Sequence, residues 1–165
     1  MSKSIILSDD EIQHKIRRIA FQIYESNSKN KEVILAGIAE NGFLLAQQLK
    51  QVLDEVSELK TQLCEVKINK QKPLKGVQTS SEVSAYKDKS LVLVDDVLNS
   101  GTTLMYAIKH FLDVPLKQFK TAVLVNRNHK KYPVKADFKG ISLSTSLQEH
   151  VTVEFSKKEA IAYLS

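Results

Sequence analysis

Two adjacent carboxylates stand directly after a hydrophobic run and just before a turn that is rich in hydroxyl groups. The run covers residues 91–94 (LVLV), the carboxylates are Asp95 and Asp96, and the turn covers residues 99–103 (NSGTT). Adjacent strand residues point to opposite faces, so one of the two would be buried, at a cost of several kcal/mol, inside a covered sheet. We therefore expect the pair at the carboxyl edge of a sheet, where open α/β sheets place ligands.

The turn after the pair has the composition of a phosphate cradle. Gly101 lets backbone amides approach an anion closely, and the amino end of a following helix carries about half a positive charge. The carboxylates beside it could accept sugar hydroxyls and hold Mg²⁺, directly or through water, because this ion prefers oxygen ligands. The spacings of a P-loop and of a dinucleotide fingerprint are both absent. The alternative is a capped turn with two solvated aspartates.

The elements that must position this segment alternate between strand-like and helix-like patterns. Ser8 and Glu11 form a capping-box pattern, and apolar residues at helical spacing follow from Ile12 to Ile23. We expect buried strands over 33–38, 91–94 and 122–125, a half-exposed strand at 64–68, helices over 42–56 and 102–112, and strands around 138–143 and 151–155; residues 159–164 fit a strand or a short helix. This order predicts an α/β fold with a mostly parallel central sheet flanked by helices.

Composition limits the class of protein. The chain has 165 residues, 42% of them hydrophobic, which predicts a single domain over residues 1–165. One cysteine, Cys64, excludes a disulfide framework within the chain, and residues 1–8 lack a secretory leader, so we expect a cytoplasmic protein without a membrane partner. The net charge of +5 suits nucleic acid, polyphosphates or a merely solvated surface. His14, His110 and His150 have no metal-ligand spacing and are expected on the surface.

Residues 92–103 resemble the phosphoribosyl pyrophosphate (PRPP) signature of type I phosphoribosyltransferases. The whole chain is most similar to the family of bifunctional pyrimidine operon attenuators and uracil phosphoribosyltransferases. The segments that carry this likeness are 16–20 (IRRIA), Gly37-Ile38, 94–98 (VDDVL), 122–125 (AVLV) with Arg127 and His129, 133–137 (PVKAD) and Thr145-Ser146. The resemblance implies a type I phosphoribosyltransferase fold, with a flexible loop at about 69–89 and a small hood.

The resemblance also implies an activity. Such enzymes transfer the phosphoribosyl group of PRPP to a nucleobase, here with uracil favoured, and release pyrophosphate with Mg²⁺ as cofactor. Two alternatives are a pyrimidine-responsive RNA-binding attenuation regulator and a catalytically inactive PRPP-binding domain. PRPP and a nucleobase are then the expected partners, RNA is a further candidate, and a homodimer or higher homo-oligomer is expected.

Residue roles follow from the same resemblance. Asp95 and Asp96 would be the catalytic pair on the ribose hydroxyls and the Mg²⁺ ligands. The PRPP-binding segment would be Asp95, Asp96, Val97, Leu98, Asn99, Ser100, Gly101, Thr102 and Thr103. A pyrophosphate loop, often with a cis peptide that does not involve proline, would be Ala39, Glu40, Asn41 and Gly42; the nucleobase would meet Val125, Asn126, Arg127 and His129. Lys70 or Lys72 would act from the flexible loop as a point charge.

The chain departs from the family pattern at each subsite. Residues 39–41 (AEN) replace Lys-Thr-Arg, so Glu40 would repel pyrophosphate unless it points away or binds Mg²⁺. Residues 68–71 (INKQ) replace Tyr-Arg-Asp-Asp, and residues 126–129 (NRNH) replace Asp-Arg-Gly-His. Asn99 stands where 6-oxopurine enzymes have an aspartate; an amide cannot serve as a general base, which favours a pyrimidine or a reaction without such a base.

Overall fold

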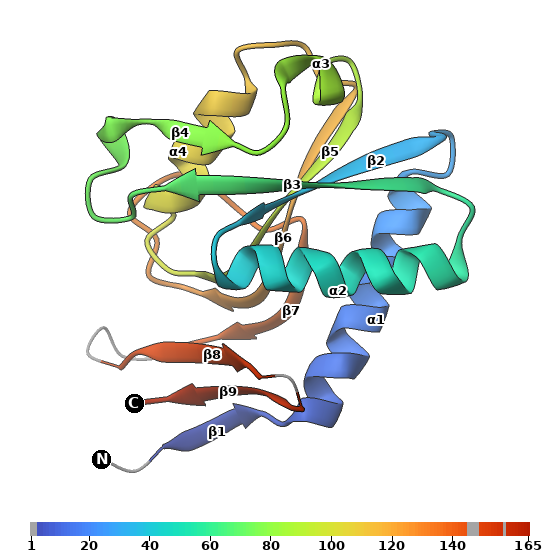
Figure 1. The fold of residues 1–165 in the computed structure, drawn as a ribbon. Coiled ribbons are helices and arrows are strands. Elements are labelled where there is room, and N and C mark those ends of the chain that lie inside the picture. The colour runs from blue at the N-terminus through green and yellow to red at the C-terminus, as the bar shows by residue number, and fades with distance from the viewer. Residues whose placement is uncertain (1–2, 145–148, 157) are drawn as a thin grey trace.

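Six strands form the central sheet of the computed structural model, which describes residues 3–144, 149–156 and 158–165 (Figure 1). Their order in space is β4–β3–β2–β5–β6–β7. The strands are β2 (Glu32–Ile38), β3 (Lys60–Ile68), β4 (Val77–Thr79), β5 (Ser90–Leu98), β6 (Gln118–Arg127) and β7 (Phe138–Leu143). Only β4 runs antiparallel to its described neighbour, so the expected mostly parallel sheet is confirmed.

Helices cover both faces of this sheet, and each face has its own hydrophobic core. Helices α1 (Asp9–Ser26) and α2 (Asn41–Val56) pack on one face, over the side chains of Val92, Val94 and Leu124. Helix α4 (Thr102–Phe111) packs on the other face, over Leu91 and Leu93. Strands with apolar residues on both sides are what a sheet covered on both faces requires, which explains the unbroken hydrophobic runs of the sequence.

Helix α1 begins at the expected capping box and closes one edge of the sheet. The Ser8 hydroxyl accepts from the Glu11 amide at 3.3 Å, and the Ser8 amide donates to Glu11 Oε1 at 3.2 Å. Farther along the helix, Arg18 Nη2 donates to the carbonyl oxygens of Lys139 (3.0 Å) and Gly140 (2.8 Å) in the edge strand β7. An edge strand has no further strand beside it, and this guanidinium binds the backbone of β7 in place of one.

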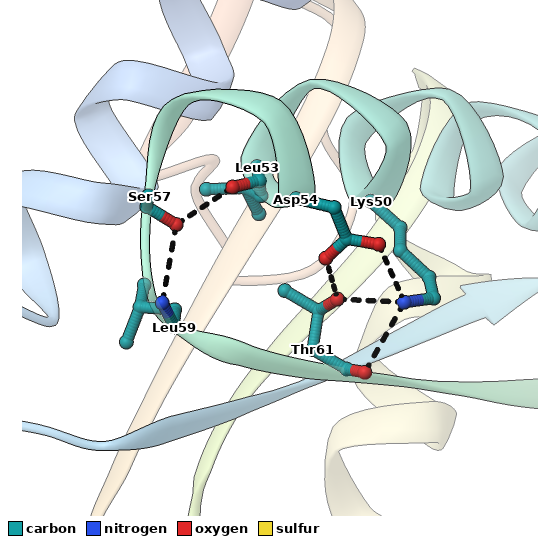
Figure 2. Close-up of polar contacts among 6 residues, drawn as sticks. All are labelled: Lys50, Leu53, Asp54, Ser57, Leu59 and Thr61. Carbon is teal, nitrogen blue, oxygen red and sulfur yellow. Dashed lines mark hydrogen bonds and ion pairs between the residues drawn. The ribbon is translucent and has the colours of Figure 1, made fainter.

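A polar cluster joins the end of α2 to the start of β3, as Figure 2 shows. Lys50 Nζ donates to Asp54 Oδ2 and to Thr61 Oγ1, each at 2.8 Å, and the Thr61 hydroxyl in turn donates to Asp54 Oδ1. The Ser57 hydroxyl donates to the carbonyl oxygen of Leu53 at 2.7 Å, where α2 ends. These bonds anchor the first residues of β3, whose other end leads to Lys70 and the carboxyl edge of the sheet.

The segment 69–89 has more regular structure than an irregular loop. It contains the 3₁₀ helix η1 (Pro73–Lys75), strand β4 and the short helix α3 (Val83–Tyr86). Strand β4 pairs with β3 through Val77↔Ile68 and its neighbours. Tyr86 is buried at 2% exposure and contacts Phe111 edge-on, with ring centroids 5.1 Å apart. Local hydropathy gives no sign of these elements, because isolated apolar residues anchor the segment without any periodic pattern.

A second, smaller sheet lies beside the main one and contains the first and the last of the described strands (Figure 1). Its described strands are β1 (Ser4–Leu7), β8 (Val151–Phe155) and β9 (Ala160–Leu164), in the antiparallel order β1–β9–β8, so the tail is a strand rather than a helix. We call this sheet the hood. It packs on the same core as α1 and α2 through Leu7, Val153 and Ala162.

Thr145 and Ser146 lie outside the described residues. Among the helices of the described ranges, none combines the length and apolar character that a bilayer crossing requires.

Candidate functional site

The acidic pair lies near the carboxyl end of the central strand β5, as predicted, but the strand continues beyond it. Pairing with β6 runs through Asp95↔Val123 and on to Leu98↔Asn126. The expected end of the strand at the pair is therefore wrong, because the parallel ladder still has partners there. Asp95 is only 3% exposed, whereas Asp96 is half-buried. One carboxylate thus faces the protein interior and its neighbour borders the open edge.

Burial determines the electrostatics of Asp95. Loss of solvent raises the pKa of the Asp95 carboxyl well above its ordinary value, and the neighbouring charge of Asp96 raises the same pKa further. The Lys70 ammonium, with Nζ 3.8 Å from Asp95 Oδ1, lowers it in part. Asp95 Oδ1 also accepts from the Asp96 amide at 2.9 Å. A cationic ligand at this point would favour the charged carboxylate and relieve the cost of burying it.

The amino end of α2 lies directly against the acidic pair. A Cβ atom on Gly42 would lie 2.6 Å from the carbonyl oxygen of Val94 and 2.9 Å from Asp95 Cα, so only glycine fits. The preceding peptide, Ala39–Glu40, is cis, in agreement with the resemblance. Glu40 is exposed and does not line the cavity described below. Its carboxylate is therefore not part of the cavity wall.

Asn41 connects three elements at this place. Its Nδ2 atom donates to Asp96 Oδ2 at 3.0 Å and to the carbonyl oxygen of Val153, in the hood strand β8, at 2.8 Å. The sequence indicated this asparagine only as part of a loop, and no local pattern connects it with a strand that begins 110 residues later along the chain.

The turn between β5 and α4 has the conformation that its glycine permits. Gly101 has a φ of +89°, in the left-handed region, and a Cβ atom there would lie 2.5 Å from Val134 Cγ1. The carbonyl oxygen of Ser100 accepts from the amides of Lys131 (2.8 Å) and Tyr132 (3.0 Å), which holds the turn in place. The Ser100 and Thr102 hydroxyls are 2.9 Å apart. Helix α4 begins immediately after this turn, so the positive end of its dipole lies at the hydroxyl groups.

Carboxylates and turn together surround one cavity of about 210 Å³. Every residue of the expected PRPP-binding segment lines it, together with Lys70: Asp95, Asp96, Val97, Leu98, Asn99, Ser100, Gly101, Thr102 and Thr103. Two further lining residues, Leu104 and Val151, were not indicated by the sequence. Lys72 instead borders a separate groove beside Tyr106 and Tyr132. The structure therefore separates the two candidate lysines and places Lys70 at the carboxylates.

A second hollow of about 360 Å³ adjoins the cavity. Its lining residues are Asn99, Ser100, Arg127, His129, His150 and Val151, of which Asn99, Ser100 and Val151 also line the cavity. Arg127 Nη1 donates to Asn99 Oδ1 at 3.3 Å, which links the two hollows. Arg127 and His129 are thus next to the carboxylate segment.

The other two residues expected to meet a nucleobase lie elsewhere. Val125 is fully buried in the core, and Asn126, 6% exposed, donates from Nδ2 to Ser142 Oγ at 3.2 Å. Within the described part of the chain, neither residue lines either hollow. Conversely, His150 and Val151 were not predicted here, because the hood that carries them is positioned by long-range strand pairing. Their residue types alone contain no signal of this role.

The donor set of the cavity fits a hard cation that is only partly held by protein. Over the described residues, no cluster of three or more histidine, cysteine, aspartate or glutamate side chains could hold a metal ion. Asp95 and Asp96 supply carboxylate oxygens, and Mg²⁺ commonly takes one or two carboxylates while water and phosphate oxygens complete its shell. The site therefore fits Mg²⁺ that arrives together with a phosphorylated ligand.

Comparison with known proteins agrees with this geometry. A family model described as phosphoribosyl transferase domain matches residues 4–158. A protein named bifunctional protein PyrR from Alkaliphilus metalliredigens is 35% identical over 173 residues, covering 98% of this chain and 95% of that protein. The protein of the same name from Bacillus pumilus is 34% identical over 168 residues, covering 94% and 92%.

Solved structures resemble the fold. A hypoxanthine-guanine phosphoribosyltransferase from Bacillus anthracis superposes with a TM-score of 0.78 at 18% identity, covering 100% of this chain and 99% of that one. The hypoxanthine phosphoribosyltransferase of Trypanosoma cruzi has a TM-score of 0.78 at 13% identity, covering 98% and 96%. At such low identity these two structures establish the shared architecture and leave the choice of base open.

Proposed function

The chain belongs to the phosphoribosyl transferase domain family and has the type I phosphoribosyltransferase fold, and we propose that its cavity transfers the phosphoribosyl group of PRPP to uracil. The observation that supports this most strongly is that residues 95–103 form one continuous wall of the cavity at the carboxyl edge of the sheet. An acidic pair, a hydroxyl-rich turn and a helix amino end then face a single ligand, which must contain both sugar hydroxyls and phosphate.

Each part of PRPP has a counterpart in this wall. Asp95 and Asp96 accept hydrogen bonds from the two ribose hydroxyls, and the turn from Ser100 to Thr103 holds the 5′-phosphate with hydroxyls and amides. Asp95 and Asp96 would hold Mg²⁺, and this ion would supply positive charge that neutralises the leaving group. The protein thus holds the sugar and aligns it with the base.

The transfer itself needs few protein groups. A ring nitrogen of uracil forms a bond to C1 of the ribose, the bond from C1 to the pyrophosphate oxygen breaks, and the ring nitrogen loses its proton to water. Lys70 supplies a positive charge for the departing pyrophosphate, which partly compensates for the absence of cations at Ala39 and Asn41. We assign to the segment around Lys70 the role of a lid, which covers the reacting centre and excludes water from it.

The neighbouring hollow is the proposed nucleobase subsite. Arg127 and His129 line this hollow and can donate hydrogen bonds to the carbonyl oxygens of a pyrimidine. Asn99 lies between the subsites and bears an amide, which cannot take the proton of a purine ring nitrogen. These features favour uracil over the 6-oxopurines.

A base screen tests this proposal. The protein is incubated with PRPP, Mg²⁺ and one of uracil, cytosine, adenine, guanine or hypoxanthine, and both the nucleotide and the pyrophosphate are quantified. We expect UMP and pyrophosphate in equal amounts, and far less product with purines. Nucleotide from a purine only would refute the choice of base, while PRPP binding without product from any base would identify an inactive PRPP-binding domain.

A second activity, pyrimidine-responsive RNA binding, is favoured by the net charge of +5 and by the name bifunctional given to the relatives. Binding of a structured RNA would weaken steeply with salt, because lysines displace counterions from phosphates. The test measures the affinity for RNA at salt concentrations from about 50 to 200 mM, with and without UMP. Affinity for a hairpin no greater than that for an unrelated RNA, and no response to UMP, would refute it.

Light scattering would test the expected homodimer or larger assembly.

A further inference from the structure

The side-chain amide of Asn41 uses both of its N–H groups at the proposed site. One N–H points to Asp96 Oδ2, with 3.0 Å between the heavy atoms, and the other points to the Val153 carbonyl oxygen at 2.8 Å. Asn41 is half-buried at the first residue of α2. A side chain whose two donors end on two different elements fixes those elements relative to each other.

The first of these bonds determines how the Asp96 carboxylate is oriented. Asp96 Oδ1 accepts from the Val97 amide at 2.8 Å, and Asp96 Oδ2 accepts from Asn41. Among the ion pairs of the described residues none involves Asp96, because Lys70 lies at Asp95 instead. A neutral amide orients a carboxylate without forming an ion pair with it, so the Asp96 carboxylate stays available to a ligand.

The second bond holds the hood over the sheet. Strand β8 is one of the two edge strands among the described strands of the hood, and Asn41 supplies a donor to its backbone at Val153. Val151, two residues earlier in the same strand, lines both the cavity and the adjoining hollow. The position of Val151 is therefore tied, through β8 and Asn41, to the position of Asp96.

We propose that Asn41 is a positioning residue that couples the two subsites: it orients Asp96 toward the ribose and holds the hood residue Val151 against the base. This inference rests on the proposed function. It assigns to the loop that lacks the family's cations a different task from binding pyrophosphate. It also gives Asn41 two separable effects, one through Asp96 and one through the backbone of Val153.

Kinetics of Asn41→Leu, with Asn41→Ala as a second variant, separate these effects. Leucine has nearly the same size as asparagine and no donor. The loss of one hydrogen bond to a charged group predicts an increase of about tenfold in the KM for PRPP, and the released hood predicts an increase of about threefold or more in the KM for uracil. The matched control is Asn30→Leu at the opposite end of the sheet, where Asn30 Nδ2 donates to Asn27 Oδ1 at 2.9 Å. Both KM values should stay within about twofold of the wild type in this control.

A double mutant distinguishes positioning from a loss of stability. In the Asp96→Asn background, Asn41→Leu should change the KM for PRPP by less than about twofold, because its partner is already altered, while the KM for uracil still rises. A residue that only stabilises the fold would lower the active fraction, and hence kcat, with both KM values unchanged. That result, or a fully additive effect on the KM for PRPP, would overturn the inference.

The same variants keep this test separate from the proposed function. Absence of product with the wild type would refute the proposed transferase activity. Titration with PRPP and Mg²⁺ would then test the role of Asn41 through the binding affinity alone. We expect about tenfold weaker binding for Asn41→Leu than for the wild type and no further weakening in the Asp96→Asn background. Equal affinity of Asn41→Leu and the wild type would refute the role of Asn41 even if the transferase is confirmed.

Discussion

Replacement of Gly42 by alanine inserts one methyl group between the amino end of α2 and the acidic strand. The new Cβ would lie 2.6 Å from the Val94 carbonyl oxygen and 2.9 Å from Asp95 Cα, whereas ordinary contact begins at 3.4 Å. Helix and strand would therefore have to separate by roughly 0.8 Å, the difference between 3.4 and 2.6 Å. Both of these contacts are with backbone atoms, so no side chain can rotate away to make room.

Two opposing effects decide the sign of the change in stability. Alanine is favoured over glycine in a helix interior by about 1 kcal/mol, and by less at the second residue of a helix. Overpacking against backbone costs about 1–3 kcal/mol. We expect the second effect to dominate, with a net loss of about 1–2 kcal/mol and a Tm lower by about 2–8 °C for a chain of this size. Because the shift displaces Asp95, the affinity for PRPP with Mg²⁺ should fall by roughly 10- to 100-fold.

Thermal unfolding without ligand and calorimetric titration with PRPP and Mg²⁺ measure these two effects. Gln47→Ala, on the exposed face of the same helix, is the control and should change neither quantity. A Gly42→Ala protein with the Tm and the PRPP affinity of the wild type would refute the close packing of α2 on the acidic pair. Lower stability with unchanged affinity would show that Asp95 does not bind the ligand.

Three further predictions concern single side chains. Burial raises the pKa of Asp95 above 3.8, so the contribution of this carboxyl to stability is complete below that pH and is lost as the pH rises through the raised pKa. In EDTA, Asp95→Asn should therefore become more stable than the wild type as the pH increases to neutrality. A Tm difference between the two proteins that does not depend on pH would contradict this. Lys70→Met should raise the KM for PRPP by roughly tenfold and Lys72→Met by less than about twofold; equal effects would remove Lys70 from the site. Ser8→Ala should reduce the free energy of unfolding by about 1 kcal/mol in urea denaturation, and an unchanged value would show that the capping box adds no stability.

Local patterns predicted the elements that build the sheet and its acidic edge. The runs 33–38, 91–94 and 122–125 are buried strands, and Asp95 and Asp96 follow one of them at its carboxyl end, because burial on both faces leaves polar residues only at strand ends. Strand β5 nevertheless continues to Leu98, since its length depends on partners in β6 that hydropathy does not reveal.

Features that depend on distant parts of the chain were not predictable from local pattern. Val77 and Tyr86 anchor the segment 69–89 as single apolar residues, without a periodicity that would indicate β4 or α3. The bond from Asn41 to Val153 joins residues 112 positions apart, and Val151 reaches the site only because the hood packs beside β5. Such contacts follow from tertiary packing, which overrides local preference.

A crystal structure of the protein with PRPP and Mg²⁺ tests the central claim most directly. We expect ribose hydroxyls at Asp95 and Asp96, the 5′-phosphate in the turn from Ser100 to Thr103, and the pyrophosphate within reach of Lys70. PRPP bound in another orientation, with the sugar away from the carboxylates, or a cavity that stays without PRPP at saturating concentration, would contradict it.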